Sequence, residues 1–205
     1  MSTSPRLESS IKEHLAPALK ADGFSGSGRT YRRVVGDLIH VVNVQGSRYG
    51  GQFAINLAIH PICIPNVLGD MPDPKKITDS QCEFRRRLTE SGSDQWWAYE
   101  NSAESMDAAV KAATNVYNVV GRKFLAPFTS NGSPLHVVTA ESLESSQLNL
   151  HGFASTKVRM ALALARFRKA KGQTEAAHEF AKVGQAAAGS AVALRKAFES
   201  IYAEA

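Results

Sequence analysis

Residues 30–60 alternate apolar and polar side chains over short stretches that are separated by tight turns. The stretches are Thr30–Val35, Leu38–Ser47 and Phe53–His60. A period of two residues is typical of a β-strand that buries one face. The turns at Gly36 and Gly50 are too short for a parallel crossover, which needs a dozen residues or more. This part of the chain therefore predicts three consecutive antiparallel strands.

Helical periodicity lies on both sides of these strands. Apolar residues recur at every fourth position from Leu7 to Leu19, and Gly23 follows as a stop signal. A second apolar stripe runs through Ser102–Phe124, with Ser102 as the N-cap. Two further strands, Gln81–Thr89 and a short one at residues 96–99, follow an irregular crossing over residues 61–78. We therefore expect an α+β fold with an antiparallel sheet of four to five strands flanked by helices.

The C-terminal quarter of the chain differs in composition from the rest. From Ser155 onward it is rich in alanine, with helix breaks expected at Gly172 and Gly189. Residues 155–205 hold nine Lys/Arg and four Asp/Glu, which accounts for the whole net charge of +5. We expect an α+β core domain at 1–128, a connecting segment at 129–154 and a basic α-helical extension at 155–205.

Four motifs in the core part resemble a known family. In order they are GF…GRTYRR, HVVNVQGSRYGGQFAINLAI, CEFRRRL and DQWW. Over about residues 7–128 the chain resembles the bacterial family of the domain of unknown function 4304. This resemblance implies an α+β fold with an antiparallel sheet, and it implies no activity.

Strand parity predicts one candidate binding surface. Successive side chains of a strand point to opposite faces, so the apolar residues of the predicted strands share one face. On the other face parity gathers amides and arginines: Asn43, Gln45, Asn56, Arg85 and Arg87. Guanidinium and amide groups supply forked donors suited to carboxylates, phosphates and backbone amides. The alternative is that this is only the solvated face of an antiparallel sheet.

The helical extension offers another candidate surface. Its stretch ALALARFRKAKGQTEAAHEFAKVGQ resembles a single tetratricopeptide hairpin, although such repeats usually need about three copies. Arg159, Arg166 and Lys169 are expected on its solvated face, where they would meet an acidic partner. We interpret the chain as a protein-binding module. The alternatives are a nucleic-acid-associated protein that uses the basic helices, and an enzyme of unknown chemistry on the polar sheet face.

Catalytic and metal signatures are weak in this sequence. It has no G-x-S-x-G elbow, H-E-x-x-H motif or phosphate-binding loop, so whether it is an enzyme stays uncertain and no cofactor is expected. His60 and Cys63 form the one close ligand pair, and structural zinc usually needs two such pairs, so we expect Cys63 and Cys82 to be free thiols without a metal. Without an apolar run of about 18 residues or a signal peptide, we expect a cytoplasmic protein and no membrane partner.

Overall fold

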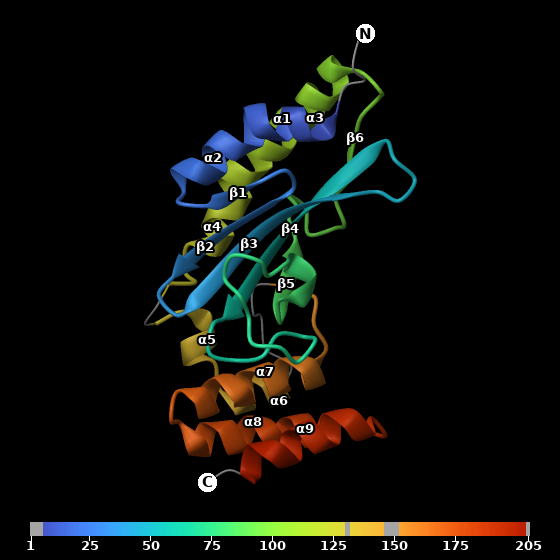
Figure 1. The fold of residues 1–205 in the computed structure, drawn as a ribbon. Helices are drawn as coiled ribbons and strands as arrows, with labels where there is room; N and C mark the ends of the chain where they lie inside the picture. Colours follow the sequence, from blue (N-terminus) through green and yellow to red (C-terminus); the bar gives the residue numbers. More distant parts are fainter. Residues whose placement is uncertain (1–5, 130–131, 146–151, 204–205) are drawn as a thin grey trace.

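The computed structural model describes residues 6–129, 132–145 and 152–203 and shows an α+β fold (Figure 1). Its six strands are β1 (Ser25–Ser27), β2 (Thr30–Val35), β3 (Leu38–Gly46), β4 (Gln52–Pro61), β5 (Phe84–Arg87) and β6 (Trp97–Ala98). All pairings are antiparallel, in the order β1-β2-β3-β4-β5, with β6 beside β4. The predicted fold class is confirmed. The short strand Ser25–Ser27, which pairs with β2, is an addition to the expected strands.

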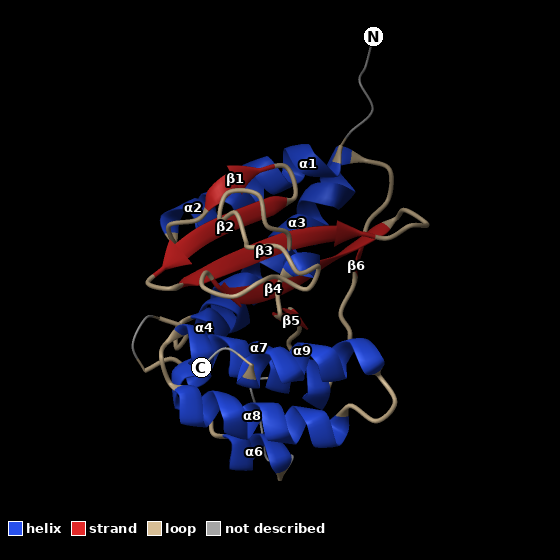
Figure 2. Ribbon diagram, turned by 60° about the horizontal axis from the view of Figure 1, so that its bottom comes forward, coloured by secondary structure: helices blue, strands red, loops and turns tan. Residues whose placement is uncertain are grey.

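Two long helices cover one face of the sheet (Figure 2). The first comprises α1 (Leu7–Ser10), the π-helical η1 (Ile11–Leu15) and α2 (Ala16–Ala21). The second comprises α3 (Ala103–Val116), the π-helical η3 (Tyr117–Gly121) and α4 (Arg122–Leu125). The Ser102 side chain accepts a hydrogen bond from Ser105 N, as expected of an N-cap. Apolar residues of both helices meet the inward face of β3 and β4, where Val42, Ile55 and Leu57 are fully buried.

The opposite face of the sheet is only partly open. Residues 62–83, including the 3-10 turn η2 (Asp79–Gln81), cross it and cover a small apolar cluster. Ile39, Val41 and Ala58 lie in this cluster and are fully buried with Cys82. This half of the second face is therefore covered by the chain and not solvated. The polar residues occupy the half that this crossing leaves uncovered.

The C-terminal helices form a layer at one end of the molecule (Figure 1). They are α7 (Lys157–Ala170), α8 (Thr174–Ala187) and α9 (Val192–Tyr202), and they follow two short helices, α5 (Pro134–Val137) and α6 (Ala140–Glu144). Their apolar residues belong to the same core as the sheet. Phe153 joins the two parts, because its ring centroid lies within 5.5 Å of those of Phe84, Phe124 and Phe128. The helical extension is therefore docked, as its apolar stripes require.

Candidate functional site

The five predicted residues lie on one face of the sheet, at the end that residues 62–83 leave open. Asn43 and Gln45 come from β3, Asn56 from β4, and Arg85 and Arg87 from β5. The register pairs Asn43 with Asn56 and Asn56 with Arg87, so three of them form one row across the strands. We call the five together the polar sheet surface.

Three donors of the polar sheet surface converge on a single oxygen atom. Gln45 Oε1 accepts hydrogen bonds from Asn56 Nδ2 at 3.0 Å, Arg85 Nη2 at 3.1 Å and Arg87 Nη1 at 3.1 Å. Arg87 Nη1 also donates to Asn56 Oδ1 at 2.9 Å. An amide oxygen is neutral and has two lone pairs. The donors include two positively charged guanidinium groups, and the acceptor that they surround is a neutral amide oxygen.

Each of the two arginines contacts a carboxylate through its Nε atom. Arg87 Nε donates to Asp94 Oδ1 at 2.8 Å, and Asp94 is exposed. Arg85 Nε lies 2.8 Å from Oδ2 of the buried Asp79, with the N–H bent too far for a hydrogen bond, so the contact is an ion pair. Both arginines are thus oriented with their Nη groups toward Gln45, and such ion pairs hold a guanidinium in one geometry.

An aromatic residue borders the same surface. The indole of Trp96 lies under the guanidinium of Arg87, 4.9 Å from centroid to carbon, and its Nε1 donates to Asp94 Oδ2. Trp96 is half-buried, whereas Trp97 is buried against Phe53. Trp97 therefore belongs to the core, and Trp96 remains at the surface. A half-exposed tryptophan beside an arginine has the composition of an interface hot spot.

Asn43 stands apart from the convergent donors. Its Nδ2 donates to Thr30 Oγ1 at 2.9 Å, so its amide is directed toward β2 and away from Gln45. Asn56 is itself 2% exposed and lies beneath the arginines. Asn43, Gln45, Arg85 and Arg87 are all half-buried, and of these the last three form the convergent group.

The basic residues of the helical extension are used inside the molecule. Arg159 Nη2 lies 3.0–3.1 Å from both oxygens of Glu83, and Arg166 lies 4.0 Å from the same carboxylate. Lys169 donates to two carbonyls at the end of α9. All three side chains are half-buried and have partners within the molecule, and their binding of an acidic partner stays a prediction. Glu83 is buried beside α7. Burial raises the pKa of its carboxyl group, and the charges of Arg159 and Arg166 oppose that rise.

The residues considered for thiol and metal chemistry lie in the core. Cys63 and Cys82 are free thiols, and burial raises the pKa of the Cys82 thiol far above its usual range. Both ring nitrogens of His60 contact backbone groups, Glu83 N and Ile64 O. A different group, Glu13, His14 and Asp107, has ligand atoms within 4.8 Å of one another and can hold a cation. Three ligands with one exposed carboxylate leave most of a coordination shell to water, and we assign no metal there.

Sequence reasoning missed three members of this site. Asp79 lies in the 3-10 turn η2 and Asp94 in an irregular segment, where strand parity does not apply, and Trp96 was noted without being connected to Arg87. The sequence did contain one signal for the two carboxylates. Two arginines on a half-buried sheet face need negative charges nearby, so acidic residues in the adjoining segments could have been assigned to them.

The fold and this site together define an α+β protein with an antiparallel sheet and an arginine-amide surface. Within the described residues, no helix is both long and apolar enough to cross a membrane. A family model described as Domain of unknown function (DUF4304) matches residues 15–125, which is more than half of the chain, so the protein belongs to this family. Comparison with curated proteins gives no match, and comparison with solved structures gives none either.

Proposed function

We propose that this protein is a non-enzymatic binding module whose polar sheet surface receives a carboxylate side chain from a protein partner. The observation that carries the proposal is the convergence of Asn56, Arg85 and Arg87 on Gln45 Oε1. These donors already point at one place, so a ligand would meet a preorganised site. The Gln45 oxygen occupies the position that a stronger acceptor would take.

A carboxylate fits this position better than the glutamine does. It brings a full negative charge and accepts charge-assisted hydrogen bonds, which are roughly twice as strong as neutral ones. Asp94 is exposed and lies in an irregular segment, so a partner can approach Arg87 from that side. Trp96 adds apolar area next to the charged group, as anchors of protein interfaces do.

An extended partner suits this surface because the donors lie on the pleated face of a sheet rather than within a cavity. The basic helical extension is a weaker candidate for nucleic-acid binding, since Arg159, Arg166 and Lys169 contact other parts of the chain. Phosphate recognition depends on cations that remain available to the backbone of the nucleic acid.

The substitution Gln45→Glu tests this proposal, because it supplies the missing carboxylate from within the chain. The probe is a fluorescein-labelled, amidated peptide, Ala-Leu-Glu-Leu-Ala, and the matched neutral peptide carries Gln in place of Glu. We expect fluorescence anisotropy to show saturable binding of the Glu peptide to the native protein. Gln45→Glu should weaken this binding about tenfold or more, because like charges at an interface cost several kcal/mol.

The variant Gln185→Glu is the control, because it makes the same charge change on α8, far from the sheet. It should bind the Glu peptide as the native protein does. In the same experiment Gln45→Glu should raise the denaturation midpoint, since a glutamate there would face two guanidinium groups. Equal binding of the Glu and Gln peptides to the native protein would rule the proposal out.

A further inference from the structure

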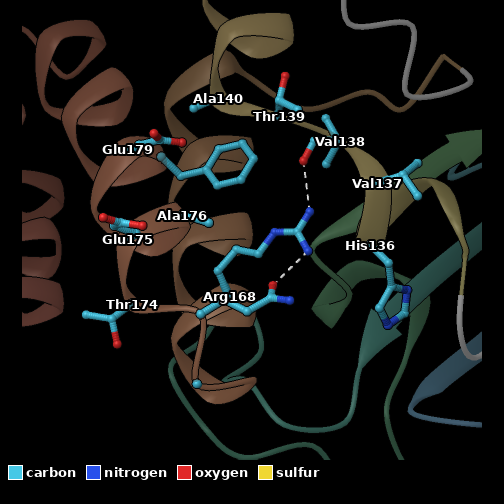
Figure 3. A pocket seen from close by; sticks show the side chains of 13 residues that line it. His136, Val137, Val138, Thr139, Ala140, Arg168, Thr174, Glu175, Ala176 and Glu179 are labelled. Carbon is cyan, nitrogen blue, oxygen red and sulfur yellow. Dashed lines mark hydrogen bonds between the residues drawn. The ribbon is translucent and has the colours of Figure 1, made fainter.

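A cavity of about 720 Å³ opens between the segment before α6 and the turn that joins α7 to α8 (Figure 3). Val138 and Thr139 line one side, and residues 172–176, 179 and 180 line the other. Its volume lies in the range of small-molecule and peptide-side-chain sites, about 300–1,000 Å³. It belongs to the helical extension and shares no residue with the polar sheet surface.

A buried arginine lies among the residues that line this cavity. Arg168 is 5% exposed; its Nη2 donates to Val138 O at 2.8 Å and its Nη1 to Gln173 Oε1 at 3.0 Å (Figure 3). Its Nε is buried and has no hydrogen-bond partner among the described residues. A buried donor without a partner costs about 1–3 kcal/mol, so an acceptor oxygen at this place would be favourable.

Two carboxylates stand at the other side of the cavity. Glu175 and Glu179 are four residues apart on α8, so they lie one turn apart on the same face of that helix (Figure 3). Both are exposed, and no ion pair is formed by either within the described part of the chain. The wall between them and Arg168 is apolar and includes Ala176 and the ring of Phe180.

We propose that this cavity is a second binding site, which takes a peptide segment carrying an arginine or lysine side chain between apolar neighbours. A backbone carbonyl of the segment would accept from Arg168 Nε. The basic side chain would extend past Ala176, which is half-buried, and its charged end would meet Glu175 and Glu179. The neighbouring apolar side chains would rest on Val137, which is 66% exposed at the rim.

The arrangement favours a basic ligand over an acidic one. Both Nη groups of Arg168 already donate to Val138 and Gln173, which leaves one N–H, enough for a neutral carbonyl. The two free carboxylates repel an anion and attract a cation. This is the opposite of the charge preference at the polar sheet surface, so the two sites take different segments.

The double substitution Glu175→Gln and Glu179→Gln tests the proposal in the full-length protein. The probe is a fluorescein-labelled, amidated peptide, Ala-Leu-Arg-Leu-Ala, and the reference peptide carries Gln in place of Arg. We expect saturable binding of the Arg peptide by fluorescence anisotropy, and about fivefold weaker binding to the double variant, because two ion pairs at a partly enclosed rim are lost.

The control is the double variant Glu104→Gln and Glu199→Gln, which loses the same charge at exposed positions on α3 and α9. It should bind the Arg peptide as the native protein does. Equal affinity of the two double variants would overturn the proposal, as would equal binding of the Arg and Gln peptides. Gln45→Glu should leave Arg-peptide binding within about twofold, so failure here is distinguishable from failure at the polar sheet surface.

Discussion

His40 and His60 are fully buried in neighbouring strands, and the fold holds both of them neutral. His40 Nδ1 accepts from Arg33 Nε at 3.2 Å, and its Nε2 donates to Phe128 O at 2.7 Å. Burial lowers the pKa of each imidazole to about 4, and the charge of Arg33 adds to the effect at His40. Neither ring has a free nitrogen, so both act in structure and not in proton transfer.

These histidines should make the protein sensitive to acid. Between the ordinary pKa of about 6.5 and the folded value of about 4, the unfolded chain binds protons that the folded chain excludes. The free energy of unfolding should therefore fall as the pH drops through this window, by about 3 kcal/mol for each histidine. Urea denaturation at pH 7, 5.5 and 4 measures the slope.

The variant His60→Gln separates the two contributions. It should lower stability at pH 7, because the contacts with Glu83 N and Ile64 O are disturbed, and it should roughly halve the loss between pH 7 and 4. An unfolding free energy that stays constant from pH 7 to 4 in the native protein would contradict the prediction. His178, which is half-buried on α8 and outside the sheet, is the control position, and His178→Gln should leave the slope unchanged.

Residue parity explains why much of the polar sheet surface was predictable. A period of two residues assigns each strand residue to a face, and this assignment placed Gln45, Asn56 and Arg87 together. The convergence on Gln45 Oε1 was not predictable, because it depends on the register of β5 against β4 and on arginine rotamers. The arginines are held by Asp79 in the 3-10 turn η2 and by Asp94 in an irregular segment, and strand parity applies to neither residue.

At the scale of elements, hydrophobic periodicity predicted the strands well, whereas the composition of the connecting segments predicted their structure less well. The bounds predicted for β2 match the structure, and those for β3 and β4 differ by about one residue at a few ends. The crossing at residues 62–83 was missed as a cover for the sheet. Its sequence signal was Ile39 and Val41, which are apolar and lie on the face opposite Val42, so that both faces of β3 need cover there.

The contact between α8 and α9 depends on the absence of a side chain at Gly184. A Cβ atom there would lie 2.1 Å from Cζ of Phe198, which is fully buried. The substitution Gly184→Ala should therefore lower the free energy of unfolding by about 1–3 kcal/mol, although alanine is the better helix former by about 1 kcal/mol. Urea denaturation of the variant measures the change.

A second substitution shows whether the clash is the cause. Phe198→Leu shortens the side chain that meets the new methyl group. The double variant should lose less stability than the two single variants added together, because the single effects are coupled through one contact. Additive effects would mean that Gly184 matters for a reason other than this close approach.

At the scale of the whole molecule, the residues that match the family model and the residues that form the hydrophobic core span different parts of the chain. The family model covers residues 15–125, whereas the hydrophobic core continues through Phe153 and the apolar face of α7. Sequence resemblance could not reveal this continuity, because it depends on which surfaces the C-terminal helices bury. The stripes containing Leu162 and Phe198 indicated only that these helices must bury against something.

Removal of residues 155–205 tests how far the sheet depends on the helical extension. A fragment ending at Ala154 loses α7, which exposes the aromatic cluster around Phe153 and leaves the buried carboxylate of Glu83 without Arg159. An exposed apolar patch promotes aggregation, and a buried charge without its partner is strongly destabilising. We therefore expect the fragment to aggregate or to melt well below the full chain. Addition of the separate 155–205 peptide should restore solubility, since it returns the covering surface. A fragment that stays soluble and melts at the temperature of the full chain would show that the docked helices contribute little to the stability of the sheet.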